Sequence, residues 1–261
     1  ESVGFYKMTP SLFFMDKLKG YALTAVLGGL IVGVFLYLVN ELGQPFWLYF
    51  WGVASVVMIL LNMFYTSIFV PLFNKLTPLE EGSLKTAITN YAQQVNFPIT
   101  NVYVIDGSKR SSKSNAFFSG IGSKKKVVLY DTLIEQHSEE ELVAIIAHEV
   151  GHYKKKHIIS GLFLSVAQIG FTLYILSLLI FNEALSLALG GQQLAVHLNL
   201  IAFGILYSPI STLTGLLMNV VSRKNEFEAD ANAAKTNSSN PMHQALKKLS
   251  AHNMSNLLPH S

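Results

Sequence analysis

Residues 147–152 read Ala-His-Glu-Val-Gly-His, and this stretch near the middle of the 261-residue chain decides how its neighbours are interpreted. Residues four apart share one face of a helix, so His148 and His152 can direct two imidazoles at one metal ion. Glu149, one position further round, can reach a water molecule beside that ion. The spacing is typical of zinc-binding helices in peptidases.

The residues before this stretch predict the helix that carries it. Ser138 is a helix N-cap, with Glu141 at the reciprocal position of a capping box. The apolar side of the helix consists of Leu142, Ile145, Ile146 and Val150. Further upstream, β-rich stretches at residues 102–105, 115–119 and 127–130 predict a small sheet.

A second capping pattern lies at residues 77–80, which read Thr-Pro-Leu-Glu. Threonine as N-cap, proline at the first helical position and glutamate closing the box predict a helix that begins at Thr77 and ends near Val95.

Composition points to a membrane protein. Apolar residues make up 51% of the chain and charged residues only 13%, and the mean hydropathy is +0.38. This hydropathy is high for a soluble enzyme, and the charged fraction is low. The chain contains no cysteine, which excludes disulfides and cysteine-ligated zinc or iron–sulfur sites. A bound metal must therefore use histidine and carboxylate ligands.

Four long apolar runs, at residues 21–39, 46–70, 158–181 and 194–221, contain no Lys, Arg, Asp or Glu. Each reaches the roughly 17–20 residues that a helix needs to cross a bilayer. We therefore expect four membrane spans, the last of them kinked at Pro209.

These spans predict the organisation of the chain. Residues 1–70 form a membrane region with two spans, and residues 71–157 form a catalytic insertion that contains the small sheet and the histidine helix. Residues 158–221 contain two further spans, and residues 222–261 form a final segment outside the membrane.

The distribution of basic residues predicts the orientation. The short connections at residues 40–45 and 182–193 lack Lys and Arg, whereas the segments on the other side carry nearly all of them. The positive-inside rule places those basic segments, and His148 with them, in the cytosol.

The third metal ligand is expected after the fourth span. Glu226 and Asp230 are four residues apart and share a helical face. Two histidines and one glutamate leave an open position for water, as in hydrolytic zinc sites. In this interpretation Glu226 binds zinc, Asp230 accepts a hydrogen bond from a ligand histidine, and Glu149 is the general base. Glu228 faces away from Glu226 and is interpreted as a solvated charge.

Beyond residues 147–152, three stretches resemble the Ste24-type CAAX prenyl protease family. They read Pro-Leu-Phe-Asn-Lys-Leu-Thr-Pro-Leu at 71–79, Gly-Ser-Lys-Arg-Ser-Ser-Lys-Ser-Asn-Ala-Phe-Phe at 107–118, and Ser-Arg-Lys-Asn-Glu-Phe-Glu-Ala-Asp at 222–230. The resemblance implies a mostly α, polytopic membrane protein with a small β-containing, gluzincin-like catalytic domain on the cytosolic side.

The resemblance also implies a substrate. Asn115, Ala116 and Phe117 match a gluzincin edge strand that pairs with a peptide backbone. Family members cleave prenylated proteins near the C-terminus, so the implied partners are a peptide or prenylated protein substrate and membrane lipid. The implied location is the endoplasmic reticulum membrane in a eukaryote or the inner membrane in a bacterium.

The chain also differs from the family. Family members carry additional spans before its first residue and a Ser-His-Pro-Pro segment, with a histidine assigned to oxyanion stabilisation, after its last. We therefore expect this sequence to lack N- and C-terminal parts of the family pattern.

Two alternatives to CAAX processing stay open. One is a general quality-control metallopeptidase of membrane proteins without a prenyl requirement. The other is a catalytically impaired membrane scaffold with a structural zinc, against which Glu149 argues because structural sites are usually closed by four ligands. No nucleic-acid partner is expected, and the sequence does not define the oligomeric state.

Overall fold

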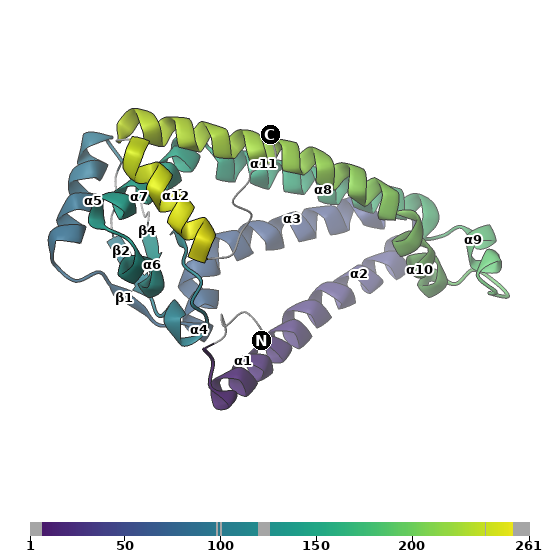
Figure 1. Cartoon of the computed structure of the whole chain (residues 1–261). Coiled ribbons are helices and arrows are strands. Elements are labelled where there is room, and N and C mark those ends of the chain that lie inside the picture. The colour runs from purple at the N-terminus through teal and green to yellow at the C-terminus, as the bar shows by residue number, and fades with distance from the viewer. Residues whose placement is uncertain (1–6, 98, 100, 120–125, 238, 253–261) are drawn as a thin grey trace. The chain divides into compact units, whose positions relative to one another are not determined.

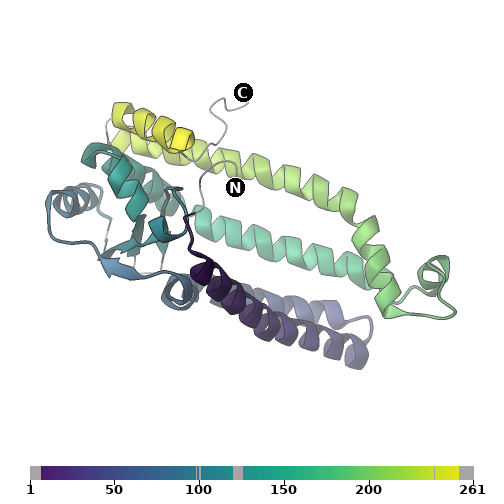
Figure 2. The same cartoon turned by 60° about the horizontal axis from the view of Figure 1, so that its bottom comes forward.

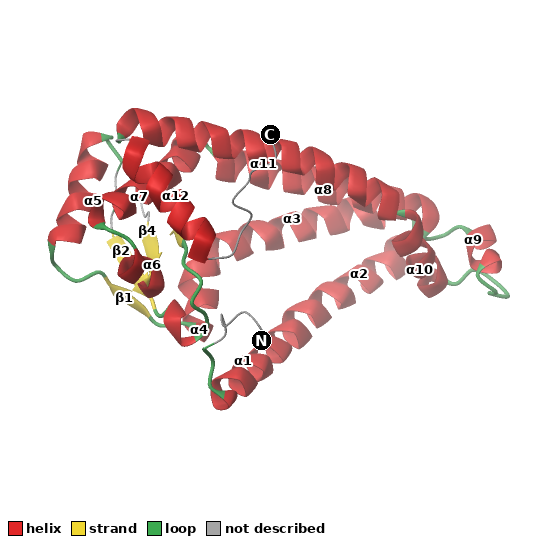
Figure 3. Ribbon diagram, in the orientation of Figure 1, coloured by secondary structure: helices red, strands yellow, loops and turns green. Residues whose placement is uncertain are grey.

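The computed structural model describes residues 7–97, 99, 101–119, 126–237 and 239–252, and these fall into two compact units. The first unit takes in the chain up to residue 19, residues 62–157 and the chain from residue 225. The second unit comprises residues 20–61 and 158–224. Figure 3 shows that helices dominate the described residues and that the strands are confined to the first unit.

The first unit contains a mixed four-stranded sheet with the strand order β1-β2-β4-β3. Its strands are β1 Leu76–Pro78, β2 Asn101–Ile105, β3 Ala116–Ser119 and β4 Lys126–Tyr130. β2 and β4 are parallel, whereas β1 and β3 pair antiparallel to them at the edges. Val127, Val128 and Leu129 in β4 are buried, as expected for an inner strand covered on both faces. The three predicted strands are therefore confirmed.

The predicted helix from Thr77 to Val95 is wrong at its beginning. Thr77 and Pro78 lie in β1, opposite Val104 and Tyr103 of β2, and helix α5 spans only Ser83–Gln94. The Thr77 hydroxyl donates to the Val104 carbonyl at 3.4 Å instead of capping a helix. Proline is tolerated here because β1 is an edge strand.

Three further helices, α6 Asp131–Gln136, α7 Glu139–Lys154 and α12 Ser239–His252, complete this unit together with the end of α11 (Figure 1). The predicted capping box of α7 is present: the Glu141 N–H donates to Ser138 Oγ at 3.3 Å and the Ser138 N–H donates to Glu141 Oε2 at 2.9 Å. The core between sheet and helices includes Ile88, Val127, Leu129, Leu142, Ile146 and Val150.

Three helices among the described residues are long and apolar enough to cross a membrane: Pro10–Leu42, Phe46–Phe73 and His157–Leu179. The first comprises α1 Pro10–Leu23, a π-helical turn Thr24–Gly28 and α2 Gly29–Leu42. The second comprises α3 Phe46–Phe64, a π-helical turn Tyr65–Phe69 and α4 Val70–Phe73. The third is α8.

A fourth apolar segment consists of α10 Val196–Leu206 and α11 Ser208–Thr236, which meet at 49°; such a bent pair is either one broken span or a re-entrant loop, so the described residues contain three or four of the expected spans. The bend is visible in Figure 2, where both helices are green near the break. The break falls at Tyr207, two residues before Pro209, where the sequence predicted a kink; proline has no N–H to donate to the preceding turn. A short helix, α9 Glu183–Ala188, precedes α10 in the chain.

The second unit has its own buried apolar cluster, made of Val39, Phe46, Phe50, Leu173, Leu176 and Ile180. Most other large apolar side chains of these helices are exposed, Phe163 at 72% and Val26 at 69% among them. Such surfaces suit lipid rather than water. Asn199 in α10 is buried and donates to the carbonyls of Ile180 and Asn182, so this polar residue holds the connection between α8 and α9. The protein is a multi-pass membrane protein.

Candidate metal centre

Helix α7 brings the two histidines of the central motif together. The Nε2 atoms of His148 and His152 lie 3.1 Å apart, and their ring centroids are 4.8 Å apart. Both rings are largely buried, with 13% and 20% of their side chains exposed. The four-residue spacing on one helix therefore places both imidazoles at one point.

Helix α11 supplies the acidic side of the cluster. Glu226 places Oε2 3.4 Å from His148 Nε2 and Oε1 3.6 Å from His152 Nε2. One helical turn later, Oδ1 of Asp230 lies 2.8 Å from Nδ1 of His148. The two carboxylates therefore contact opposite nitrogens of the His148 ring.

Gly151 allows the two helices to come this close. A Cβ atom at this position would lie 2.9 Å from both the Cα and the carbonyl oxygen of Ala229 in α11. Ala229 lies between Glu226 and Asp230, and it is fully buried. The lack of a side chain at Gly151 thus lets α11 approach α7 closely enough for Glu226 and Asp230 to contact the histidines.

The atoms of this cluster fit a single metal ion. The ligand atoms of His148, His152 and Glu226 all lie within 4.8 Å of one another. Around a zinc ion with bonds of about 2.0–2.1 Å, two tetrahedral ligand atoms are separated by about 3.3 Å. The observed separations of 3.1, 3.4 and 3.6 Å agree with that geometry. Two nitrogens and a carboxylate are also a ligand set that zinc accepts.

The surroundings shift the pKa values of the motif in different directions. Burial raises the pKa of Glu149 to about 7; His148 opposes this rise and Glu226 adds to it. Burial lowers the pKa of His152. Burial also lowers the pKa of His148, but the hydrogen bond to Asp230 and the charges of Glu149 and Glu226 raise it above its ordinary value overall. Glu149 is consequently suited to exchange protons near neutral pH.

Two residues join this cluster that the sequence did not indicate. His157, the first residue of α8, places Nδ1 3.0 Å from Nδ1 of His152. Glu228 places Oε2 3.3 Å from His157 Nε2, so its interpretation as a solvated charge is wrong. Glu228 does face away from Glu226, as positions two apart in a helix must, but the start of α8 lies on that side.

The predicted substrate strand lies at an edge of the sheet. Asn115 is exposed just before β3, and its side-chain Oδ1 accepts a hydrogen bond from the N–H of Ala116 at 2.9 Å. Ala116 is buried in the core, and Phe117 packs edge-to-face against Tyr65 at 6.5 Å between ring centroids. β3 pairs with β4 and packs against α7, the helix that carries the histidines.

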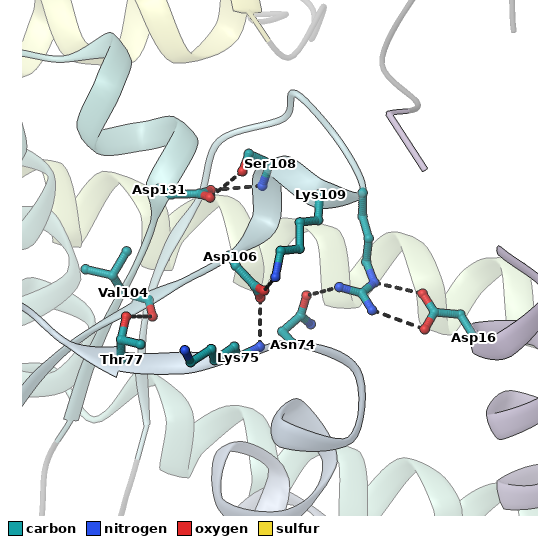
Figure 4. Close-up of polar contacts among 10 residues, drawn as sticks. Asp16, Asn74, Lys75, Thr77, Val104, Asp106, Ser108, Lys109 and Asp131 are labelled. Carbon is teal, nitrogen blue, oxygen red and sulfur yellow. Dashed lines mark hydrogen bonds and ion pairs between the residues drawn. The ribbon is translucent and has the colours of Figure 1, made fainter. Parts of the chain in front are cut away.

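The Ser-Lys-Arg-Ser-Ser run, residues 108–112, begins in a 3₁₀ turn, Gly107–Lys109, and its side chains form hydrogen bonds to other segments (Figure 4). The Ser108 N–H donates to Asp131 Oδ1 at 2.9 Å. Arg110 donates two hydrogen bonds to the Asp16 carboxylate, at 2.8 and 3.1 Å, and a third to Asn74 Oδ1 at 2.9 Å. Two of the stretches that resemble the family are therefore in direct contact.

A helical membrane protein that combines a small mixed sheet with a His-Glu-x-x-His helix and a distant glutamate has the architecture of the membrane-embedded metallopeptidases. The family model for peptidase family M48 matches residues 78–260. The model described as CAAX prenyl protease N-terminal, five membrane helices, matches residues 1–75. The chain belongs to peptidase family M48, in the group of CAAX prenyl proteases.

Individual relatives agree with this assignment. The chain is 36% identical to the probable CAAX prenyl protease 1 of Schizosaccharomyces pombe, over 98% of this chain and 54% of the relative. It is 37% identical to the Arabidopsis thaliana homolog of CAAX prenyl protease 1, over 97% of this chain and 60% of the relative. The crystal structure of S. mikatae Ste24p superposes with a TM-score of 0.90 at 31% identity, over 99% of this chain and 64% of that chain. The chain thus spans little more than half the length of these curated relatives.

Proposed function

We propose that this chain carries the zinc site of a membrane-embedded endopeptidase that hydrolyses peptide bonds near the C-terminus of prenylated CAAX-type substrates. The observation that supports it is the meeting of His148, His152 and Glu226 beside Glu149. In this proposal His148, His152 and Glu226 bind zinc, and Glu149 is the general base. Asp230 holds the His148 ring in its metal-binding tautomer.

The reaction is the addition of water to a peptide carbonyl. A zinc ion held by these side chains would acidify a coordinated water and polarise the scissile carbonyl. Glu149 accepts a proton from the attacking water, and the C–N bond then breaks as Glu149 returns that proton to the leaving amine. Its pKa of about 7 suits both transfers. No covalent intermediate with the protein is needed.

The substrate proposal rests on the sheet edge and on the relatives. In this proposal a peptide in extended form adds to the outer edge of β3, the last strand of the sheet, where Asn115, Ala116 and Phe117 would contact its backbone and side chains. The relatives carry the names probable CAAX prenyl protease 1 and CAAX prenyl protease 1 homolog. The exposed apolar side chains of the membrane helices are suited to contact with lipid, in which a prenyl chain is soluble.

A metal analysis of four variants tests the ligand set. The purified chain in detergent should bind one zinc ion, and His148→Ala, His152→Ala and Glu226→Ala should each bind markedly less. His243→Ala is the matched control, because His243 is exposed on α12 and should leave the zinc content unchanged. Full zinc content in His152→Ala would show that the ligand assignment is wrong.

The substrate class needs a separate comparison. Two CAAX peptides of identical sequence, one farnesylated and one unmodified, are incubated with the chain, and products are identified by mass spectrometry. Preferential release of the C-terminal residues from the farnesylated peptide is expected. Equal cleavage of both would support a peptidase without a prenyl requirement.

We further propose that the metal centre faces the cytosol, in the endoplasmic reticulum membrane of a eukaryote or the inner membrane of a bacterium. The absence of cysteine allows a direct test. Glu135, near α7, and Gln192, between α9 and α10, are exposed. A single cysteine is introduced at each position in a separate variant. An impermeant maleimide added to vesicles whose cytosolic face is outward should label the Glu135→Cys variant alone. Labelling of Gln192→Cys alone would reverse the orientation.

A further inference from the structure

His152 has a partner on each of its two ring nitrogens. Its Nε2 atom lies 3.1 Å from Nε2 of His148 and 3.6 Å from Glu226, in the proposed metal site. Its Nδ1 atom lies 3.0 Å from Nδ1 of His157. The two rings, whose centroids are 5.1 Å apart, meet at 74°, so the ring nitrogens are in contact without the rings being stacked.

His157 is held in place from several sides. It is buried, with 8% of its surface exposed, and it follows Lys156, whose φ of 59° turns the chain between α7 and α8. On its far side, Nε2 lies 3.3 Å from Oε2 of Glu228, a residue of α11. Three chain segments thus meet in the series His152, His157, Glu228.

The chemistry of imidazole fixes the direction of these hydrogen bonds. A neutral histidine that offers Nε2 to a metal carries its proton on Nδ1. His152 then donates to Nδ1 of His157, whose own proton must be on Nε2. That second proton points at the Glu228 carboxylate. Every donor in the series therefore has an acceptor, and the series ends on a negative charge.

The two metal-site histidines are therefore oriented differently. Nδ1 of His148 donates directly to the Asp230 carboxylate at 2.8 Å, whereas Nδ1 of His152 is linked to the Glu228 carboxylate through a second imidazole, that of His157. Partners of this kind fix the tautomer and ring orientation of ligand histidines, and their loss typically weakens metal binding about 10–100-fold.

We propose that His157 and Glu228 are positioning residues that orient His152 for metal binding through a histidine–carboxylate relay. This inference rests on the proposed function, because it assigns a role relative to the metal site. It adds two residues, from α8 and α11, to a site otherwise defined by the His-Glu-x-x-His helix and by Glu226 with Asp230.

Zinc affinity, measured by competition with a chromophoric chelator, tests the relay without any measurement of cleavage. His157→Gln and Glu228→Ala should each weaken zinc binding about 10–100-fold. Glu228→Gln keeps a neutral acceptor and should lose less. Because the two residues act in series, the double variant His157→Gln/Glu228→Ala should bind zinc no more weakly than His157→Gln alone.

Cobalt substitution provides a spectroscopic readout that a purely structural role would leave unchanged. The visible absorption bands of the Co²⁺-loaded chain should shift in His157→Gln and Glu228→Ala, because the ligand field of His152 changes. Glu135→Ala is the matched control: it removes an exposed carboxylate of α6 and should alter neither affinity nor spectrum.

The outcomes separate this inference from the function on which it rests. Wild-type zinc affinity and an unchanged cobalt spectrum in Glu228→Ala, with zinc lost in His152→Ala, would overturn the relay and leave the metal site intact. Retention of zinc in His152→Ala would overturn the metal site itself. The Glu228 side chain is 35% exposed, so its removal is compatible with folding and decides the question even if His157→Gln does not fold.

Discussion

Nδ1 of His148 lies 2.8 Å from Oδ1 of Asp230, although the two residues are 82 positions apart and belong to helices α7 and α11. Asp230→Asn keeps the size of the side chain and removes its charge. We expect zinc affinity to fall about 10–100-fold, because the His148 ring loses the carboxylate that fixes its tautomer. Chelator competition measures the change, with Glu140→Gln, an exposed position of α7, as control. An unaltered zinc affinity in Asp230→Asn would show that the Asp230 carboxylate does not orient His148 for metal binding.

The contact between Gly151 and Ala229 predicts an unusually sensitive alanine substitution. A methyl group at residue 151 would lie 2.9 Å from the Ala229 backbone, so Gly151→Ala must push α7 and α11 apart. We expect a loss of about 1–3 kcal/mol in the free energy of unfolding, and weaker zinc binding because Glu226 moves with α11.

Gly161→Ala is the matched control for this substitution. Gly161 lies in helix α8, and a Cβ atom there would meet nothing within 4 Å. Alanine is favoured over glycine in a helix by about 1 kcal/mol, so thermal stability should stay the same or rise. Equal melting temperatures for Gly151→Ala and wild type would show that the helices tolerate the methyl group.

The attachment of α12 to α7 predicts a pH-dependent stability. Lys248 Nζ lies 2.7 Å from Oε1 of Glu141, whose side chain is only 4% exposed. Burial by itself raises the pKa of Glu141, but Lys248 and the Ser138 backbone lower it below its ordinary value overall. The ionised form of Glu141 is therefore more stable in the folded state than in the unfolded chain. This contribution is complete above a pH of about 4.3, the ordinary glutamate pKa, and is lost as the pH falls through the lower pKa of the folded state.

Glu141→Gln should accordingly lower the free energy of unfolding at pH 7 by about 1–3 kcal/mol, since a buried hydrogen-bonded charge is lost. The difference between variant and wild type should shrink on acidification below about pH 4. Thermal unfolding of the metal-free chain in detergent measures both effects and avoids protonation of zinc ligands. A difference that stays constant between pH 7 and pH 3 would contradict the assignment to this ion pair.

Local patterns in the sequence predicted local structure well. The capping box at Ser138 and Glu141 depends only on residues three apart, and it is present. The apolar runs predicted membrane helices because hydrophobic length is a property of a segment alone. The same kind of pattern failed at Thr77, where pairing with β2, more than twenty residues further along, outweighs a local helix signal.

In the candidate metal centre, too, some residues could be placed from local sequence patterns and others could not. Pairs four apart, His148 with His152 and Glu226 with Asp230, could be expected from helical spacing, and the structure brings them together. His157 could not be placed, because its position depends on the left-handed turn at Lys156 and on the approach of α11. Its only sequence signal was a histidine shortly after the motif.

The central claim, that Glu149 is the base beside a zinc ion held by His148, His152 and Glu226, is tested most directly by Glu149→Gln. Zinc content and cleavage of a farnesylated CAAX peptide are measured on the same preparation. We predict one zinc ion per chain, as in the wild type, and a cleavage rate lower by about 10²–10⁴-fold. A variant that retains zinc and cleaves the peptide at the wild-type rate would contradict the account.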